Sequence, residues 1–300
     1  MTQAPATLDP TTLDPTTLDP TTLDRATLHR STLHRPTPSD LRREVHVWLA
    51  ETKDHRSPDT TELFESWLSP EETLRYRRYV RGADRDLFLL SHALLRHTLS
   101  HYAEIAPAAW RFRTTKHGRP ELEDFPTDAC EPANGFGLRF NISHSAGLAA
   151  VLISNGIDGG VDVEETSGIE EPAALGRKIF PEPEVRALDG LDPVAQRQRF
   201  YEFWTLTEAY IKARGLGLSL PLRSFSFAID RESDAARRVD PEPGSDVHVK
   251  FKAPDGDEAS PWQFVLWQPT PAHQGAIAFK RDDDDDRRVV FRRGLNSGVA

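Results

Sequence analysis

Residues 160–164 set the first constraint on fold and chemistry, and they read Gly160-Val161-Asp162-Val163-Glu164. Side chains alternate between the two faces of a β-strand. A strand here therefore turns both valines into a core and both carboxylates to the opposite face. Two neighbouring carboxylates repel unless a proton or a cation lies between them, and Mg²⁺ prefers such oxygen ligands. An acidic strand edge exposed to water would explain the pentapeptide equally well.

A long helix is predicted over about residues 195–214, and it ends at Gly215, a residue type that favours the turn after a helix. Within it Trp204, Glu208 and Lys212 are spaced by four residues, so they share one side. A third carboxylate and a lysine on one stripe can meet a metal ion and a phosphate. An ordinary surface ion pair between the last two would have the same spacing.

A third segment reads Phe140-Asn141-Ile142-Ser143-His144-Ser145. It covers the end of a predicted apolar strand, 138–143, and the start of the turn that leads to a second one, 148–154. A polar turn with serine and histidine directly after a buried strand can bind an anion. A capped turn without any ligand would account for the same residues. Each of the three segments, taken alone, therefore has a purely structural explanation.

Together the three segments resemble the surfactin-type 4′-phosphopantetheinyl transferase family. That family shows F-N-[IL]-S-H-S, then G-[VI]-D-[VI]-E about 15 to 20 residues later, then W-x-x-K-E-A-[YL]-x-K-x-x-G-x-G-L. The third motif corresponds here to residues 204–218, which read W-T-L-T-E-A-Y-I-K-A-R-G-L-G-L. Gly118-Arg119-Pro120 resembles the family's G-K-P turn, and residues 83–96 resemble its second helix. The resemblance covers about residues 41–225.

The resemblance implies a Mg²⁺-dependent enzyme that moves the 4′-phosphopantetheine group of coenzyme A onto a serine of an apo carrier protein and releases 3′,5′-ADP. Asp162, Glu164 and Glu208 correspond to the metal-binding carboxylates. Glu208, or a water held by Glu164 or Glu208, would take the proton of the carrier serine. Lys212 corresponds to the lysine that contacts the pyrophosphate, which makes Glu208, Lys212 and Glu164 the catalytic candidates.

The same resemblance implies contacts to coenzyme A. The corresponding residues are Arg119, Pro120, Ser143, His144, Lys212 and, as a compensating cation, Arg85. The partners would be apo carrier domains of fatty-acid, polyketide or nonribosomal peptide synthases.

Two positions depart from the family pattern. Thr207 stands where the family has lysine, and Leu87 stands where an arginine is expected for the 3′-phosphate. Arg78, Arg81 and Arg214 are, with the arginine at position 85, the cations that could compensate. An alternative is therefore a catalytically impaired homologue that binds coenzyme A or a carrier protein without efficient transfer, and a generic coenzyme A binding module is a third possibility.

The family resemblance implies an α/β (α+β) fold: two similar subdomains related by a pseudo-twofold axis, with the active site in the cleft between them. We expect an N-terminal subdomain over residues 41–155 and a C-terminal subdomain with the metal site over residues 156–295. From the residues themselves, Ser69-Pro70 is predicted to start a helix. Later strands are predicted at 225–229, 247–251, 264–267, 276–279 and 289–291.

Residues 1–40 have a different composition from the rest of the chain. A five-residue unit repeats six times, first as Thr-Leu-Asp-Pro-Thr and later as Thr-Leu-His-Arg. One leucine in five matches neither the helical nor the strand period, and the recurring prolines oppose both structures. We interpret this region as a disordered low-complexity tail.

The bulk composition excludes several functions. A formal net charge of -10 argues against nucleic-acid binding as the main function. A single cysteine, Cys130, allows no disulfide within the chain, and no apolar stretch approaches the length of a membrane span. The sequence predicts a cytoplasmic protein with no membrane partner, and we expect a monomer.

Overall fold

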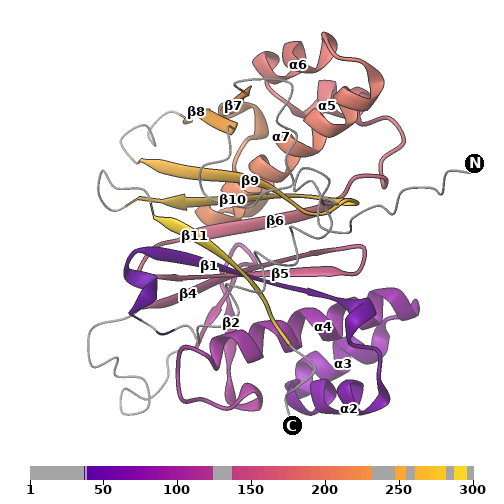
Figure 1. Cartoon of the computed structure of the whole chain (residues 1–300), viewed down its shortest axis with the longest axis vertical. Helices are drawn as coiled ribbons and strands as arrows, with labels where there is room; N and C mark the ends of the chain where they lie inside the picture. The colour runs from indigo at the N-terminus through magenta and orange to yellow at the C-terminus, as the bar shows by residue number, and fades with distance from the viewer. Residues whose placement is uncertain are drawn as a thin grey trace, which may run out of the picture.

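The computed structural model describes residues 37, 39–123, 137–231, 247–254, 261–281 and 287–295. Nearly all of the predicted tail lies outside these residues, and so does Cys130. Figure 1 shows two halves stacked along the long axis, with helices on the two outer sides and β-strands in the middle.

The first half runs from an opening strand through three helices to a long hairpin. Its elements are β1 (Glu44–Glu51), α2 (Pro58–Trp67), α3 (Pro70–Arg78), α4 (Gly82–Leu99), β2 (Phe112–Thr114), β3 (Pro120–Leu122), β4 (Leu138–Ser145) and β5 (Leu148–Asn155).

The second half repeats this order. Its elements are β6 (Gly159–Glu165), α5 (Pro172–Ile179), α6 (Glu182–Asp189), α7 (Pro193–Arg214), β7 (Ser226–Arg231), β8 (Val247–Lys252), β9 (Trp262–Thr270) and β10 (His273–Lys280).

Both halves build their main sheet in the same way. In the first half, β1 pairs antiparallel with β5, and β5 pairs antiparallel with β4. In the second half, β6 pairs antiparallel with β10, and β10 pairs antiparallel with β9. The strand orders are β11-β1-β5-β4 and β6-β10-β9, and the small hairpins β2–β3 and β7–β8 occupy equivalent places in the two halves. The predicted fold of two similar α/β subdomains is thereby confirmed.

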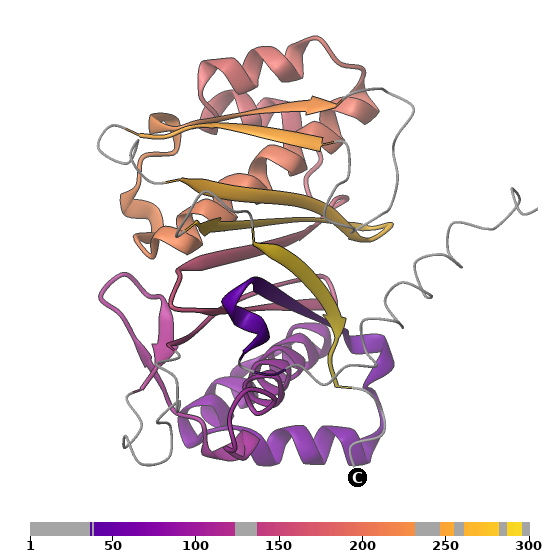
Figure 2. The same cartoon turned by 60° about the vertical axis from the view of Figure 1, so that its left-hand side comes forward.

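The last strand, β11 (Arg288–Arg293), crosses from one half to the other. It follows β10 in the chain, yet it pairs in parallel with β1 in the first sheet. Figure 2 shows this strand in yellow, passing from the upper sheet to the lower one. We expected residues 156–295 to form a single C-terminal subdomain, whereas this strand belongs to the sheet of the first half.

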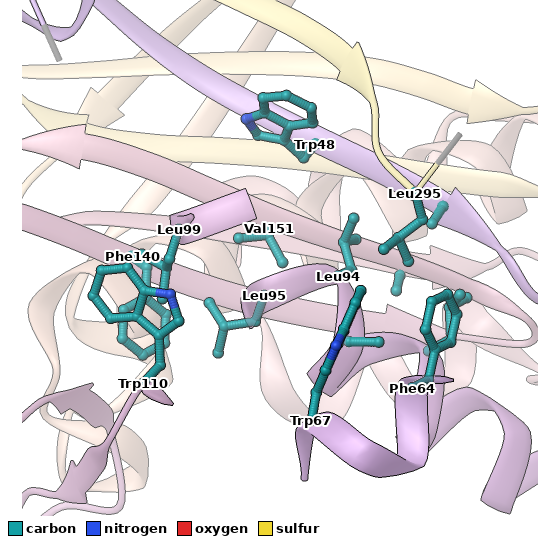
Figure 3. Close-up of a cluster of buried hydrophobic side chains, with 14 of the residues drawn as sticks. Trp48, Phe64, Trp67, Leu94, Leu95, Leu99, Trp110, Phe140, Val151 and Leu295 are labelled. Atoms are coloured by element: carbon teal, nitrogen blue, oxygen red, sulfur yellow. The ribbon is translucent and has the colours of Figure 1, made fainter. Parts of the chain in front are cut away.

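Apolar side chains form three cores. One lies between the first sheet and α2–α4 and contains Trp67, Leu94 and Phe140 (Figure 3). A second surrounds α7, which is buried along most of its length. The third lies between the two sheets and contains valines of β1 and β6. Because this third core is formed by hydrophobic side chains of both sheets, it stabilises the contact between the halves by removing hydrophobic surface from water.

Local sequence signals explain where the helices begin and end. Ser69 and Glu72 form the capping box that the Ser69-Pro70 pair predicted for α3. The side chain of Asp192 caps α7, and Gly215 ends this helix in the left-handed conformation. No helix in the described part of the chain is both long and apolar enough to cross a membrane.

Candidate active site

The site is built where β6 and α7 approach each other closely. A Cβ atom added to Gly160 would lie 2.0 Å from the carbonyl oxygen of Ala209 and 2.6 Å from the nitrogen of Ala213. Only glycine leaves room for this contact between strand and helix. The close approach sets Asp162, two residues along the strand, opposite Lys212 on the helix.

Asp162 and Lys212 form the centre of the site, and Ser143 of β4 joins them. The ammonium group of Lys212 lies 2.6 Å from Oδ1 of Asp162, 2.9 Å from Oγ of Ser143 and 3.3 Å from the carbonyl oxygen of Val161. The hydroxyl of Ser143 donates to the same Oδ1 at 2.9 Å. The other oxygen of Asp162, Oδ2, is buried and accepts no hydrogen bond from any described residue.

Glu164 lies next on the same strand, and both of its carboxylate oxygens accept hydrogen bonds. Oε1 accepts from the indole of Trp204 at 3.3 Å, and Oε2 accepts from the hydroxyl of Ser145 at 3.2 Å. Burial and then the negative charge of Asp162 raise the pKa of the Glu164 carboxyl above its usual range.

Glu208 supplies the third carboxylate from α7. It is half-buried, and burial followed by the charge of Asp162 raises its pKa. Its carboxylate makes no hydrogen bond to another described residue, so it is free to accept one from a substrate. The spacing of Trp204, Glu208 and Lys212 had predicted a shared side of the helix. Trp204 and Lys212 donate hydrogen bonds to the β6 carboxylates, and Glu208 interacts with Asp162 through charge.

His144 extends from β4 on the face opposite to Ser143, and it is exposed. Although the residue is exposed, partial desolvation of its ring, followed by the positive charges of Lys212 and His92, lowers the pKa of its imidazole. His92 of α4 in turn contacts the carboxylate of Glu72 at 2.9 Å. Lys212 and His92 thus lie near His144, and each is paired with a carboxylate, Asp162 and Glu72 respectively.

Arg119 belongs to the turn between β2 and β3, and its guanidinium reaches the end of α7. It donates to the carbonyl oxygen of Ala213 at 3.2 Å and to Asp158 at 3.0 Å, and it lies against Gly215. A cation at the C-terminus of a helix is favoured by the helix dipole. Pro120, the next residue, begins β3. Arg119 thus links the first half to the helix that carries Glu208 and Lys212.

Arg85 is the predicted site residue that the structure does not bring to this group. It lies near the start of α4, it is exposed, and its guanidinium stacks over the ring of Tyr76. At the two positions that depart from the family pattern, Thr207 is buried within α7 and Leu87 is half-buried on α4. A lysine side chain at position 207 would therefore not point freely into solvent.

The donor chemistry of the site fits a divalent cation. Asp162, Glu164 and Glu208 are oxygen ligands of the kind that Mg²⁺ prefers, and Oδ2 of Asp162 is buried without a partner. As they stand, however, no three acidic, histidine or cysteine side chains among the described residues are close enough together to hold a metal ion. Lys212 donates to the carboxylate of Asp162, and Trp204 and Ser145 donate to the carboxylate of Glu164.

Sequence reasoning missed one functional feature of the Phe140–Ser145 segment. Ser143 and His144 were singled out as phosphate contacts, but Ser145 was not, although its hydroxyl contacts Glu164. The signal was the alternation of polar residues along this segment, at positions 141, 143 and 145. Such alternation places three polar side chains on one face of a strand.

Comparisons with known proteins agree with this geometry. The family model described as "4'-phosphopantetheinyl transferase superfamily" matches residues 159–278, and the model "4'-phosphopantetheinyl transferase, N-terminal" matches residues 55–156. The 4'-phosphopantetheinyl transferase Sfp of Bacillus subtilis is 31% identical over 194 residues, which cover 65% of this chain and 80% of that protein. A putative 4'-phosphopantetheinyl transferase of Synechocystis is 27% identical over 229 residues, 75% of this chain and 87% of that protein.

The chain therefore belongs to the surfactin-type 4′-phosphopantetheinyl transferase family, a family of transferase enzymes. The two family models divide between the two halves of the fold. The first two sequence motifs lie on β4 and β6, and the third begins on α7 and continues past the end of that helix.

Proposed function

We propose that the protein transfers the 4′-phosphopantetheine group of coenzyme A to a serine of an apo carrier protein, with Mg²⁺ as the metal. The observation that carries this proposal is the group formed by Asp162, Glu164, Glu208 and Lys212 at the junction of β6 and α7. Asp162 pairs with Lys212 at 2.6 Å, Glu164 follows on the same strand, and the charge of Asp162 acts on Glu208 of α7. These are the charges needed to bind a metal ion and a pyrophosphate together.

In this proposal Asp162, Glu164 and Glu208 hold Mg²⁺, and the ion supplies charge neutralisation for the pyrophosphate. Lys212, already 2.6 Å from Asp162, orients the pyrophosphate through its ammonium donors. His144 and Ser143 of β4 would hold the phosphates from the first half, as the family resemblance implies.

The transfer step is a displacement at phosphorus. The serine oxygen of the carrier forms a bond to the β-phosphorus of coenzyme A, and the bond from that phosphorus to the bridging oxygen breaks, so that 3′,5′-ADP leaves. The serine proton passes to Glu208, directly or through a water.

The remaining coenzyme A contacts in the proposal come from the β2–β3 turn and from α4. Arg119 and Pro120 would lie beside the adenine, and Arg85 would have to leave Tyr76 to reach a phosphate. We propose carrier domains of fatty-acid, polyketide or nonribosomal peptide synthases as acceptors.

Release of 3′,5′-ADP from coenzyme A tests this function and separates it from its alternatives. The proposal expects release only when apo carrier protein and Mg²⁺ are both present. Binding of coenzyme A or of the carrier without release would instead support the impaired homologue. Release without any carrier would show a hydrolase and contradict the transferase assignment.

A further inference from the structure

Strands β4 and β6 lie side by side, although they belong to different sheets and form no backbone ladder. Side chains replace that ladder. Alternate side chains of β4 accept hydrogen bonds from alternate backbone N–H groups of β6. The pairs are Asn141 with Val161 at 2.9 Å, Ser143 with Val163 at 3.3 Å, and Ser145 with Glu165 at 3.1 Å. We call Asn141, Ser143 and Ser145 the seam.

The seam has a constant offset of twenty residues between acceptor and donor, so the two strands run in the same direction in a fixed register. Strand β6 is the edge of its sheet, and its outward N–H groups would otherwise be unpaired. Buried N–H groups without partners are costly, so the seam holds β6 against the first half. The register of the two carboxylates on β6 depends on this contact.

Ser145 has a second role that Asn141 lacks. A serine hydroxyl has one donor and two acceptor positions. In Ser145 the oxygen accepts from the backbone N–H of Glu165, and the proton is donated to Oε2 of Glu164 at 3.2 Å. One hydroxyl therefore fixes both the backbone after the carboxylate and the carboxylate itself. The other oxygen of Glu164 is held by Trp204 of α7.

We infer that Ser145 is a positioning residue that orients Glu164 for a divalent cation. This inference rests on the proposed function, because it assigns the orientation of one of the proposed metal ligands to a side chain from the other half of the molecule. Without the hydroxyl, Glu164 keeps only the hydrogen bond from Trp204 and can rotate, so metal binding must first order it. Partners of this kind typically change metal affinity by about 10- to 100-fold.

A pair of variants isolates the hydroxyl. Ser145→Thr keeps it, whereas Ser145→Val has the same branched shape without it, and both residues suit a strand. Ser145→Ala gives a second variant without the hydroxyl and with less bulk. Ser154→Val is the matched control, because the hydroxyl of Ser154 on β5 donates to the carbonyl oxygen of Ile157 at 2.8 Å, outside the seam.

The measurement is Mn²⁺ affinity of the full chain by electron paramagnetic resonance, with coenzyme A present and no carrier, beside the thermal midpoint of unfolding. We expect Ser145→Val and Ser145→Ala to bind Mn²⁺ about 10-fold or more weakly than Ser145→Thr. In transfer assays of these two variants, we expect the decrease in kcat to be larger than the increase in KM for coenzyme A. Ser154→Val should lower the thermal midpoint and leave Mn²⁺ affinity unchanged.

Equal Mn²⁺ affinities for the valine and threonine variants, in a wild-type protein that binds Mn²⁺, would overturn this inference alone. A wild-type protein that neither binds Mn²⁺ nor transfers would overturn the proposed function, and the inference with it.

Discussion

At the residue scale, the two carboxylate oxygens of Asp162 differ sharply in their hydrogen bonding. Its Oδ1 is shared by Lys212 and Ser143, while its Oδ2 is buried without a partner among the described residues. A buried polar atom without a hydrogen bond is costly, so such atoms often mark functional positions. The raised pKa values of Glu164 and Glu208 point in the same direction, because Asp162 contributes to both.

Asp162→Asn tests this position, because it keeps the shape of the side chain and removes its charge. We expect transfer to fall by about 100-fold or more, since charge stabilisation at a metal site is worth several kcal/mol. The rate of carrier modification measures the effect, and circular dichroism checks that the variant is folded. A folded variant with the wild-type rate would remove Asp162 from the mechanism.

The sequence predicted the residues of the site better than their contacts. The alternation in residues 160–164 correctly placed both valines in a core and both carboxylates on another face. Arg119 was predicted to contact coenzyme A from the family resemblance. Its observed partners, Asp158 and Ala213, come from distant parts of the chain that no local pattern connects. Contacts of this kind depend on tertiary packing, which residue spacing does not encode.

At the element scale, the junction of β6 and α7 depends on a single glycine. Gly160→Ala would place a methyl group inside the backbone of α7, so the helix must move away and Lys212 must draw back from Asp162. We expect a loss of about 1–3 kcal/mol or more in the free energy of unfolding, measured with urea. Gly82→Ala is the control, since nothing lies within 4 Å of its added Cβ. Equal stability of the two variants would contradict the close packing.

Helix α6 carries a buried acid that predicts a pH effect on stability. Burial raises the pKa of Glu184 to about 8, and among the residues that the structure describes only the backbone N–H of Phe227 donates to it, at 2.8 Å. The folded protein then binds this proton more tightly than the unfolded chain does. Its stabilising contribution is therefore complete below about pH 4.5, the ordinary value, and is lost as the pH rises through about 8.

Glu184→Gln removes this titration and keeps the acceptor for Phe227. We expect the free energy of unfolding of the wild type to fall between about pH 5 and pH 8 relative to the variant, by a few kcal/mol at most. Urea unfolding across that range measures the difference. Parallel pH profiles for the two proteins would show that Glu184 has an ordinary pKa.

Elements with strong local signals were predicted, and the exceptions have physical reasons. The helix predicted at 195–214 and all five later strands were found close to their predicted positions. Helix α2 was missed, although Ser57 caps it just as Ser69 caps α3. The pairing of β11 with β1 could not be predicted, because parallel pairing between residues more than two hundred positions apart leaves no local pattern in the sequence.

At the scale of the whole molecule, the apolar core between the two sheets predicts that both halves unfold together. Phe291 of β11 contributes to this core and contacts Trp267 of β9, so the last strand links the two sheets. Removing hydrophobic surface of this kind from water stabilises the pair of halves as one unit. The site depends on that unit, since Ser143 and Ser145 come from one half and the carboxylates from the other.

Hydrogen exchange measured at increasing urea concentrations tests this cooperativity. We expect peptides from β5 and from β10 to lose protection at the same concentration. Phe291→Ala should lower the free energy of unfolding that the β5 peptides report and the one that the β10 peptides report by the same amount, about 3–5 kcal/mol for a buried phenylalanine. Loss of protection in one half well before the other would show that the halves are independent.

The mass of an apo carrier protein after incubation with this enzyme, coenzyme A and Mg²⁺ tests the central claim most directly. We predict that the carrier gains the mass of one phosphopantetheine arm on a single serine, and that Asp162→Asn strongly reduces this gain. Carriers of fatty-acid, polyketide and peptide synthases should be tried side by side. An unchanged mass for every carrier, under conditions in which a known transferase modifies them, would contradict the claim.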